Sequence, residues 1–118
     1  MEHHAYESEQ NTNAQTRETA VRREILLLVS SCEDYLIARR NNDKHMDAAS
    51  ARRMEVERTR YGHHLMTVIG EDAADDRLAE LDIAVRRLAW LYISGAEDDV
   101  LVDDMVGEIL SVLRGSTE

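Results

Sequence analysis

No proline occurs anywhere in the 118 residues, and this absence limits the chain more than any other feature of its sequence. Proline stops or bends a helix most strongly, and glycine, the next strongest helix breaker, occurs only five times. Long stretches of the chain can therefore continue as helix. Phenylalanine is also absent, so the core must come from Leu, Val, Ile, Met and Ala, which suits the packing of helix on helix.

Apolar residues recur at intervals of three and four in four segments, which places them on one face of a helix. Turn signals separate the segments at residues 41–43, at Gly70 and at residues 94–95. Short connections favour antiparallel neighbours, so we expect an all-α, antiparallel four-helix up-and-down bundle. Residues 1–13 are polar and lack this period, and we expect a disordered, flexible tail before a single domain of residues 14–118. The predicted helices cover residues 14–40, 44–69, 73–94 and 98–114.

The sequence favours a cytoplasmic location without a membrane partner. Cys32 is the only cysteine, so no intrachain disulfide can form, as is usual in a reducing compartment. The longest apolar run is residues 25–29, far short of the roughly 18 residues that a membrane span requires. The first ten residues also lack the basic and apolar regions of a secretory signal.

The net charge of −10 is distributed unevenly along the chain. Residues 1–20 carry −3, residues 21–70 carry +2 and residues 71–118 carry −9. Binding to nucleic acid depends on neutralising phosphates with Lys and Arg, so nucleic acid is not the partner that we expect. The acidic half is suited to a basic partner surface. Its candidate residues are Asp75, Asp76, Glu97, Asp98, Asp99, Asp103 and Asp104.

The acidic run of residues 97–104 looks like an aspartate-rich metal motif, because Asp99 and Asp103 share a helix face and paired carboxylates suit Mg²⁺. Helical nucleotide pyrophosphohydrolases of the MazG type fit the size of the chain, but they need acids at i,i+3 on two facing helices, and no such pair of motifs occurs in the sequence. No histidine stands with Cys or carboxylates at zinc-site spacing either. We therefore expect no metal and no cofactor, and interpret these acids as charges that favour helix starts and solubility.

Arg58, Tyr61, His63 and His64 stand close together in an otherwise plain helical pattern. The spacing of Arg58 and His63 resembles the Arg-x4–6-His signature of the HEPN ribonucleases, which are small all-helical dimers. The resemblance implies that the two side chains act together on an RNA phosphodiester at a dimer cleft. In an unbroken helix five residues turn through about 500°, which leaves the pair about 140° apart. The helix would have to break at Gly62 for them to converge.

Arg58 falls among apolar residues on the face of its helix that should point into the bundle. Two interpretations stay open: its stem packs while the guanidinium reaches the rim, or it forms a buried ion pair with an acid from another helix or protomer. Glu57 belongs to a different stripe, with Arg53 and Arg60. There we expect surface ion pairs between neighbouring turns.

The third predicted helix carries a second apolar stripe, opposite its core face. Ile83 and Trp90 lie seven residues apart and are flanked by two arginines, and Trp beside Arg is enriched in binding hot spots. The first helix repeats the pattern with Leu26 and Ile37. Either these helices have neighbours on two sides within one bundle, or the stripes meet another chain, which we favour. The candidate partner-binding residues are Ile83, Arg86, Arg87 and Trp90.

The sequence thus predicts a small, acidic, non-enzymatic interaction protein, such as a regulator, adaptor or inhibitor, with a homodimer as the first form to expect. A phage-type inhibitor that turns its acidic half toward a nucleic-acid-handling protein is one version of this hypothesis. One alternative is a HEPN-like dimeric ribonuclease using Arg58 and His63. Another is a weak nucleic-acid-binding module using the basic segment 39–60, which holds seven bases and four acids.

Overall fold

The computed structural model consists of four α-helices and confirms the predicted all-α four-helix bundle. The structure describes residues 2–96 and 98–115, and within these ranges it does not describe the side chains of residues 2–16 and 18. No strand occurs in the described part of the chain. The helices are α1 (Glu2–His45), α2 (Ala48–Ile69), α3 (Asp75–Ser94) and α4 (Asp99–Arg114).

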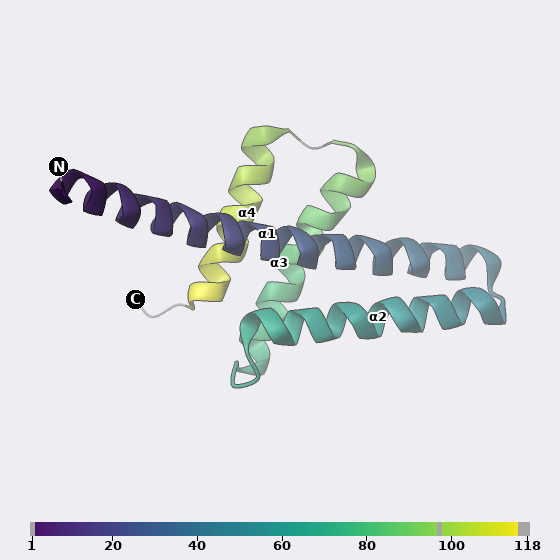
Figure 1. Cartoon of the computed structure of the whole chain (residues 1–118). Helices are drawn as coiled ribbons and strands as arrows, with labels where there is room; N and C mark the ends of the chain where they lie inside the picture. Colours follow the sequence, from purple (N-terminus) through teal and green to yellow (C-terminus); the bar gives the residue numbers. More distant parts are fainter. Residues whose placement is uncertain (1, 97, 116–118) are drawn as a thin grey trace.

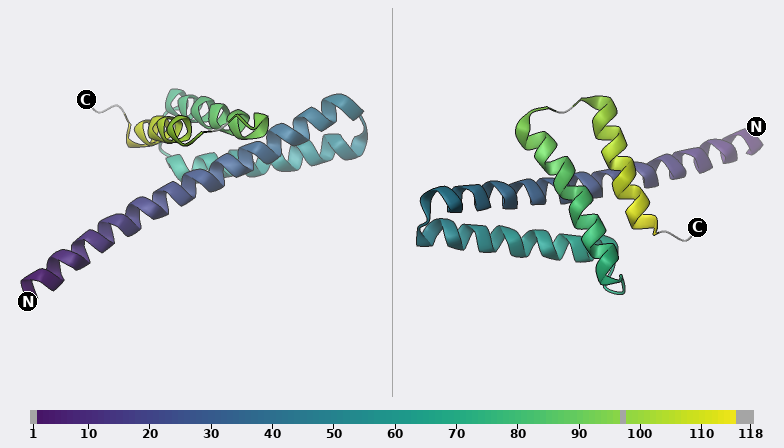
Figure 2. Two further views of the ribbon diagram at one scale, coloured as in Figure 1. Left: turned by 90° about the horizontal axis from the view of Figure 1, so that it is seen from above. Right: turned by 180° about the vertical axis from the view of Figure 1, so that it is seen from behind.

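The four helices form two antiparallel hairpins that lie in two layers. α1 and α2 form one hairpin, α3 and α4 form the other, and the second crosses over the first (Figure 1). A view from above shows the two layers stacked (Figure 2). α1 packs against all three other helices, and most extensively against α2. The bundle is therefore organised around α1.

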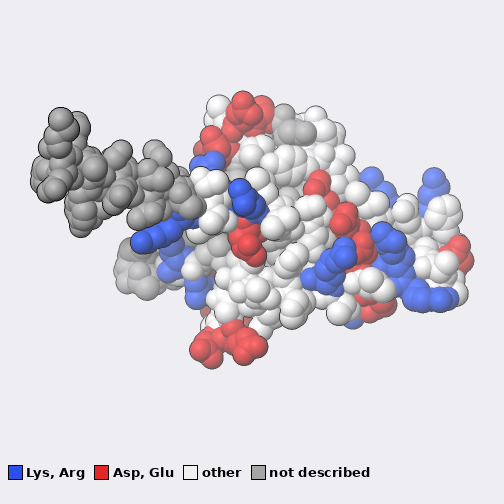
Figure 3. All heavy atoms as spheres, viewed as in Figure 1, with Lys and Arg blue, Asp and Glu red and all other residues white. Residues whose placement is uncertain are grey.

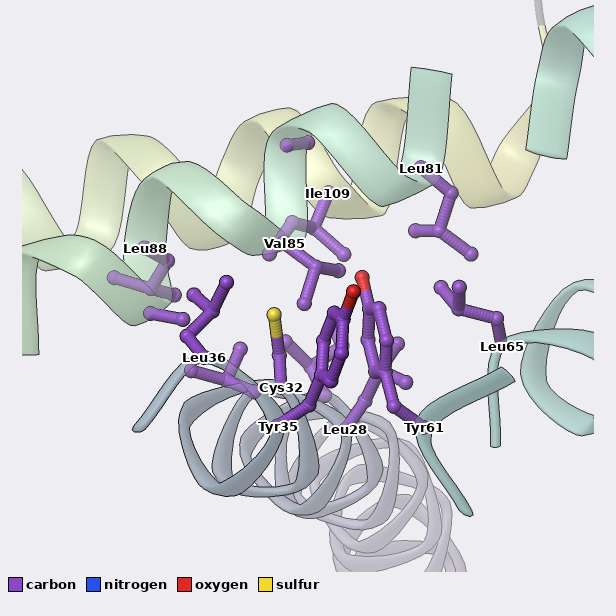
Figure 4. Close-up of a cluster of buried hydrophobic side chains, with 14 of the residues drawn as sticks. Leu28, Cys32, Tyr35, Leu36, Tyr61, Leu65, Leu81, Val85, Leu88 and Ile109 are labelled. Carbon is purple, nitrogen blue, oxygen red and sulfur yellow. The ribbon is translucent and has the colours of Figure 1, made fainter. Parts of the chain in front are cut away.

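The core lies where the two hairpins cross, and its side chains come from all four helices (Figure 4). Each fully buried aliphatic side chain stabilises the fold by roughly 1.5–3 kcal/mol relative to exposure. The apolar stripes read from the sequence supply nearly all of these residues. The buried side chains labelled in Figure 4 are Leu28, Cys32, Tyr35, Leu36, Tyr61, Leu65, Leu81, Val85, Leu88 and Ile109.

α1 begins at Glu2, twelve residues before the predicted start at residue 14. Its 44 residues make a helix about 66 Å long, and the longest extent of the molecule is also 66 Å. Residues 2–13, for which the sequence predicted a disordered tail, continue the helix and project past α4 (Figure 1). No proline or glycine stands in this stretch to end a helix. The expected mobility of the tail stays a prediction, and Met1 lies outside the described residues.

α1 also ends later than predicted, at His45 rather than at residue 40. It continues through residues 41–43, where the sequence predicted a turn, since neither proline nor glycine stands there.

The remaining helix boundaries follow local signals close to those predicted. Before α2, the Asp47 carboxylate accepts a hydrogen bond from the Ser50 backbone N–H at 2.7 Å. This forms a capping box, so the helix starts four residues later than predicted. Gly95 closes α3 in the left-handed conformation. Asp98 caps α4 by accepting from the Leu101 backbone N–H at 2.9 Å.

Candidate functional site

The outward face of α3 carries large apolar side chains that the rest of the described chain leaves uncovered. Trp90 is 42% exposed and Ile83 is 54% exposed. α3 does pack against α1, α2 and α4 within the bundle, as one interpretation expected, but these helices leave the stripe of Ile83 and Trp90 about half exposed. The stripe faces solvent, as an interface with another chain requires.

The two arginines that flank this stripe are both engaged within the chain. The Arg86 Nε donates to Asp82 Oδ1 at 2.9 Å, and its guanidinium lies 5.5 Å from the ring centre of Tyr35. Arg87 reaches sideways to Glu108 of α4, at 3.5 Å. The candidate set Ile83, Arg86, Arg87 and Trp90 thus shares one helix but not one surface, because Arg86 turns toward the core.

Arg40 of α1, which the sequence placed only in the basic segment 39–60, lies beside Trp90. Its guanidinium carbon lies 5.2 Å from the centre of the Trp90 ring, a cation–π geometry. Ile37, one turn earlier on α1, is also exposed. The apolar stripe of α3 therefore continues across Arg40 onto α1. We call Ile37, Arg40, Ile83 and Trp90 the outer surface. Sequence spacing could not pair Arg40 with Trp90, because they are fifty residues apart.

The carboxylate of Asp82 on α3 links this helix directly to α2, and its two partners, Tyr61 and Arg86, both contact Tyr35 of α1. The Tyr61 hydroxyl donates to Asp82 Oδ1 at 2.7 Å, and Arg86 donates to the same oxygen. The ring of Tyr61 stacks on that of Tyr35, with ring centres 6.1 Å apart. Figure 4 shows both rings rising from the α1–α2 layer with their hydroxyls toward α3. This arrangement fixes how the second hairpin sits on the first.

Two groups at this junction of Tyr61, Asp82 and Arg86, the Cys32 thiol and the Tyr61 hydroxyl, are protonated at neutral pH. Burial raises the pKa of the Cys32 thiol to about 11, although a hydrogen bond with Tyr61 lowers it in part. Burial also raises the pKa of the Tyr61 hydroxyl, and the charge on Cys32 and the contact with Asp82 add to this. A thiol with a raised pKa and no solvent access is a poor nucleophile. The junction is built for packing rather than for covalent chemistry.

The structure does not bring Arg58 and His63 together. α2 runs as helix through Gly62, so the rotation of about 140° between the two residues holds. Arg58 lies at the surface and pairs with Glu55 at 2.7 Å. The hydrogen bond and charge of Glu55 raise the pKa of Arg58, and the hydrogen bond and charge of Arg58 lower the pKa of Glu55. The expectation that Arg58 points into the bundle is therefore wrong, because a carboxylate one turn earlier holds it in solvent.

The buried charge on α2 is Glu57, which the sequence placed in a surface stripe. Its side chain is only 4% exposed, and its two oxygens lie 3.4 Å from Arg53 and 3.4 Å from Arg60. Both ion pairs were expected, but their carboxylate is buried while the arginines stay exposed. Nearby on α2, the Nδ1 atom of His64 is buried without a hydrogen-bond partner among the described residues.

The predicted acidic surface is split into two clusters. Because α3 and α4 are antiparallel, Asp75 and Asp76 at the start of α3 lie at the opposite end of the hairpin from the start of α4. Figure 3 shows the two groups of acids above and below the body of the molecule. Glu97 lies outside the described residues. The upper cluster comprises Asp98, Asp99, Asp103 and Asp104.

The basic segment 39–60 occupies the end of the α1–α2 hairpin, where Figure 3 shows Lys and Arg side chains. Three of its bases are exposed and make neither an ion pair nor a cation–π contact among the described residues: Arg39, Lys44 and Arg52. The arginines of α2 that follow are paired with glutamates, as described above. The segment therefore offers a small number of uncompensated positive charges.

Within the described ranges, no group of three or more His, Cys, Asp and Glu side chains is arranged to hold a metal ion. None of the helices in those ranges combines the length and apolar character that crossing a membrane requires. No protein-family model, curated protein or solved structure matches the chain.

Proposed function

We propose that this chain is a non-enzymatic interaction protein that binds another protein through the outer surface. The observation that carries the proposal is Trp90, the only tryptophan of the chain, which is 42% exposed beneath the guanidinium of Arg40. A tryptophan can bury on the order of 150–250 Å² in an interface. Tryptophan and arginine are also the residues in which binding energy concentrates.

The charge of the chain supports a partner with a basic surface. The upper acidic cluster lies at the start of α4 and is exposed. It would attract a positively charged protein and speed the encounter at low salt. A regulator, adaptor or inhibitor in the cytoplasm would act in this way, and an inhibitor of a nucleic-acid-handling protein is the form that the acidic cluster favours. A homodimer is part of the same proposal.

The test compares the proteins captured by the tagged full chain with those captured by two variants. Trp90→Ala removes the largest side chain of the outer surface, whereas Val56→Ala truncates an exposed apolar residue of α2. A hot spot of about 2 kcal/mol corresponds to roughly thirtyfold weaker binding. A direct partner should therefore be lost with Trp90→Ala and kept with Val56→Ala. Equal affinity of both variants for every partner would end the proposal.

A second candidate function is weak nucleic-acid binding by the basic segment, favoured by the unpaired Arg39, Lys44 and Arg52. Each phosphate neutralised on duplex DNA contributes about −0.9 to the slope of log affinity against log salt concentration. Three such contacts would give a slope near −3, and Lys44→Glu should reduce it. Absence of binding at low salt would remove this candidate. We do not propose ribonuclease activity, because Arg58 and His63 lie on different sides of an unbroken helix.

A further inference from the structure

An open groove lies between α1 and the last turns of α4. Its volume is about 500 Å³, and it combines an aliphatic floor with three guanidinium groups in a chain whose net charge is −10. Its apolar floor is reachable, since Val21 is exposed. The residues that form it are Arg17, Val21, Arg22, Leu110, Leu113 and Arg114. Its chemistry suits an occupant that offers carboxylates beside an aliphatic side chain.

The start of α4 has this chemistry. Val100 is 73% exposed, although it is aliphatic, and aspartates lie beside it on the first two turns. The helix therefore carries an acidic apolar segment at one end and a basic apolar groove at the other. The two ends are complementary in charge and in apolar character.

The two ends are connected by one outward stripe of α4. Its residues are spaced by three, four, three and four, the spacing of a seam along which two helices pack. They are Val100, Asp103, Gly107, Leu110 and Arg114. Of these, Asp103 lies 3.5 Å from Arg22, so a carboxylate on this stripe already contacts the rim of the groove. Arg114 has no ion pair within the described chain.

Gly107, at the middle of the stripe, is not explained by contacts within the chain. It lies inside α4 and is exposed, and a Cβ atom built on it would meet nothing within 4 Å. Glycine weakens a helix interior relative to alanine. Its advantage here is that it allows another backbone to approach closely.

We propose that α4 packs antiparallel against α4 of a second copy, with a two-fold axis close to Gly107. In such a pair, a residue that precedes Gly107 in one copy lies opposite the residue that follows Gly107 by the same number of positions in the other copy. Val100 therefore faces Arg114 of the other copy. Asp103 then lies within one turn of that arginine. A two-fold interface repeats every contact, so both acidic ends meet both grooves at once.

This pairing goes beyond the proposed function, because it uses α4 and leaves the outer surface on α3 and α1 uncovered. The chain would then dimerise through one surface and bind a different protein through another. The seam is short and depends on the charged pair Asp103 and Arg114, so the dimer should be weak and should dissociate as salt is added.

Charge reversal with complementation tests the pairing directly. Asp103→Arg and Arg114→Asp each place like charges across the axis, and each should weaken dimerisation about tenfold or more, measured by light scattering over a range of concentrations. An equimolar mixture of the two variants restores opposite charges at both contacts and should dimerise again. Gly107→Leu should also dissociate the dimer, while its circular dichroism stays helical.

The controls separate this interface from the outer surface. Asp72→Arg changes the net charge by the same amount as Asp103→Arg, but in the α2–α3 loop, and should leave the dimer intact. Trp90→Ala should also leave it intact. The pairing is refuted if the wild-type chain is monomeric at every concentration, if the mixture fails to dimerise, or if Trp90→Ala is the variant that dissociates the dimer. A monomeric wild type would refute this pairing and the homodimer of the proposed function, whereas the binding of other proteins through Trp90 tests the outer surface, so the two surfaces are tested separately.

Discussion

Two glutamates on α2, only two residues apart, show how strongly the environment decides what a residue contributes. Glu57 is buried between two arginines, whereas Glu55 is exposed and pairs with Arg58. Glu57→Lys would bury a positive charge beside Arg53 and Arg60, and should destabilise the fold by about 3 kcal/mol or more. Urea denaturation measures this.

Glu55→Lys is the matched control, with the same change of charge on the same helix. Its side chain is exposed, so water can solvate the new charge and the free energy of unfolding should change far less. Equal losses from the two substitutions would mean that the burial of Glu57 does not matter to stability.

The buried thiol of Cys32 predicts a loss of stability in alkali. The pKa of the thiol is raised from 9.0 to about 11. Below pH 9 the thiol is protonated in both the folded and the unfolded chain. Above pH 9 the thiol loses its proton in the unfolded chain but keeps it in the folded chain until about pH 11. Stability should therefore fall as the pH rises from 9 to 11, by about 1.4 kcal/mol per pH unit for this group. The raised pKa of Tyr61 adds a loss of the same sign at higher pH.

Thermal unfolding of the wild type and of Cys32→Ala between pH 7 and pH 11 measures this effect. The difference at pH 7 reports the lost packing, and the difference in slope above pH 9 reports the titration. Parallel curves for the two proteins would show that the thiol does not titrate differently on unfolding.

At this scale the sequence predicts apolar burial well and charged burial poorly. Ile25, Leu28 and Leu88 repeat at core spacing and are buried as expected. Arg58 and Glu57 are neighbours on α2, at opposite edges of its apolar face. The rotation of about 100° per residue places both side chains at the edges of this face, but it does not show which edge a neighbouring helix covers.

At the scale of the helices, α2 and α3 depend on the hydrogen bond between Tyr61 and Asp82. Tyr61→Phe keeps the ring and its stacking on Tyr35 but removes the donor to a carboxylate. Loss of a hydrogen bond to a charged group should destabilise by about 1.5–3 kcal/mol, measured by chemical denaturation.

Tyr35→Phe serves as the control, because it changes the neighbouring ring in the same way. No hydrogen bond of the Tyr35 hydroxyl is found among the described residues. This variant should lose less stability than Tyr61→Phe. The reverse order would argue against the Asp82 junction as the link between these helices.

The first turns of α1 should add little to the stability of the fold, since they project past α4 (Figure 1). A helix end without packed neighbours frays readily. Deleting residues 1–13 should leave the unfolding temperature unchanged, and amide hydrogens there should exchange much faster than those of residues 25–36. Slow exchange in residues 2–13, or a large loss of stability on deletion, would contradict the predicted tail.

Helix ends are predictable where a residue creates them. Gly70 and Gly95 end α2 and α3 as the sequence indicates, and Asp98 starts α4. The start of α1 carries no such signal. The apolar period begins where the helix enters the core, so it predicted the start of packing rather than the start of the helix.

At the scale of the whole molecule, the bundle was predictable, but the crossing of its two hairpins was not. Short loops indicate that consecutive helices are antiparallel, and this holds within each hairpin. They do not specify the direction of the second hairpin relative to the first. The same limit explains why the acidic residues of the second half of the chain form two separate clusters. Asp75 and Asp99 belong to one acidic stretch of sequence but lie at opposite ends of a hairpin. The contact between Arg40 and Trp90 likewise depends on the crossing.

The position of Trp90 also makes the protein its own optical reporter. It is the single indole of the chain and lies at the crossing, under a cation from the other hairpin. Its emission should respond when the hairpins separate, whereas far-ultraviolet dichroism responds to the loss of helix wherever it occurs. If the molecule unfolds in one cooperative step, the two signals should change together along a denaturant titration. A change in emission that precedes the loss of dichroism would show that the hairpins come apart while their helices persist.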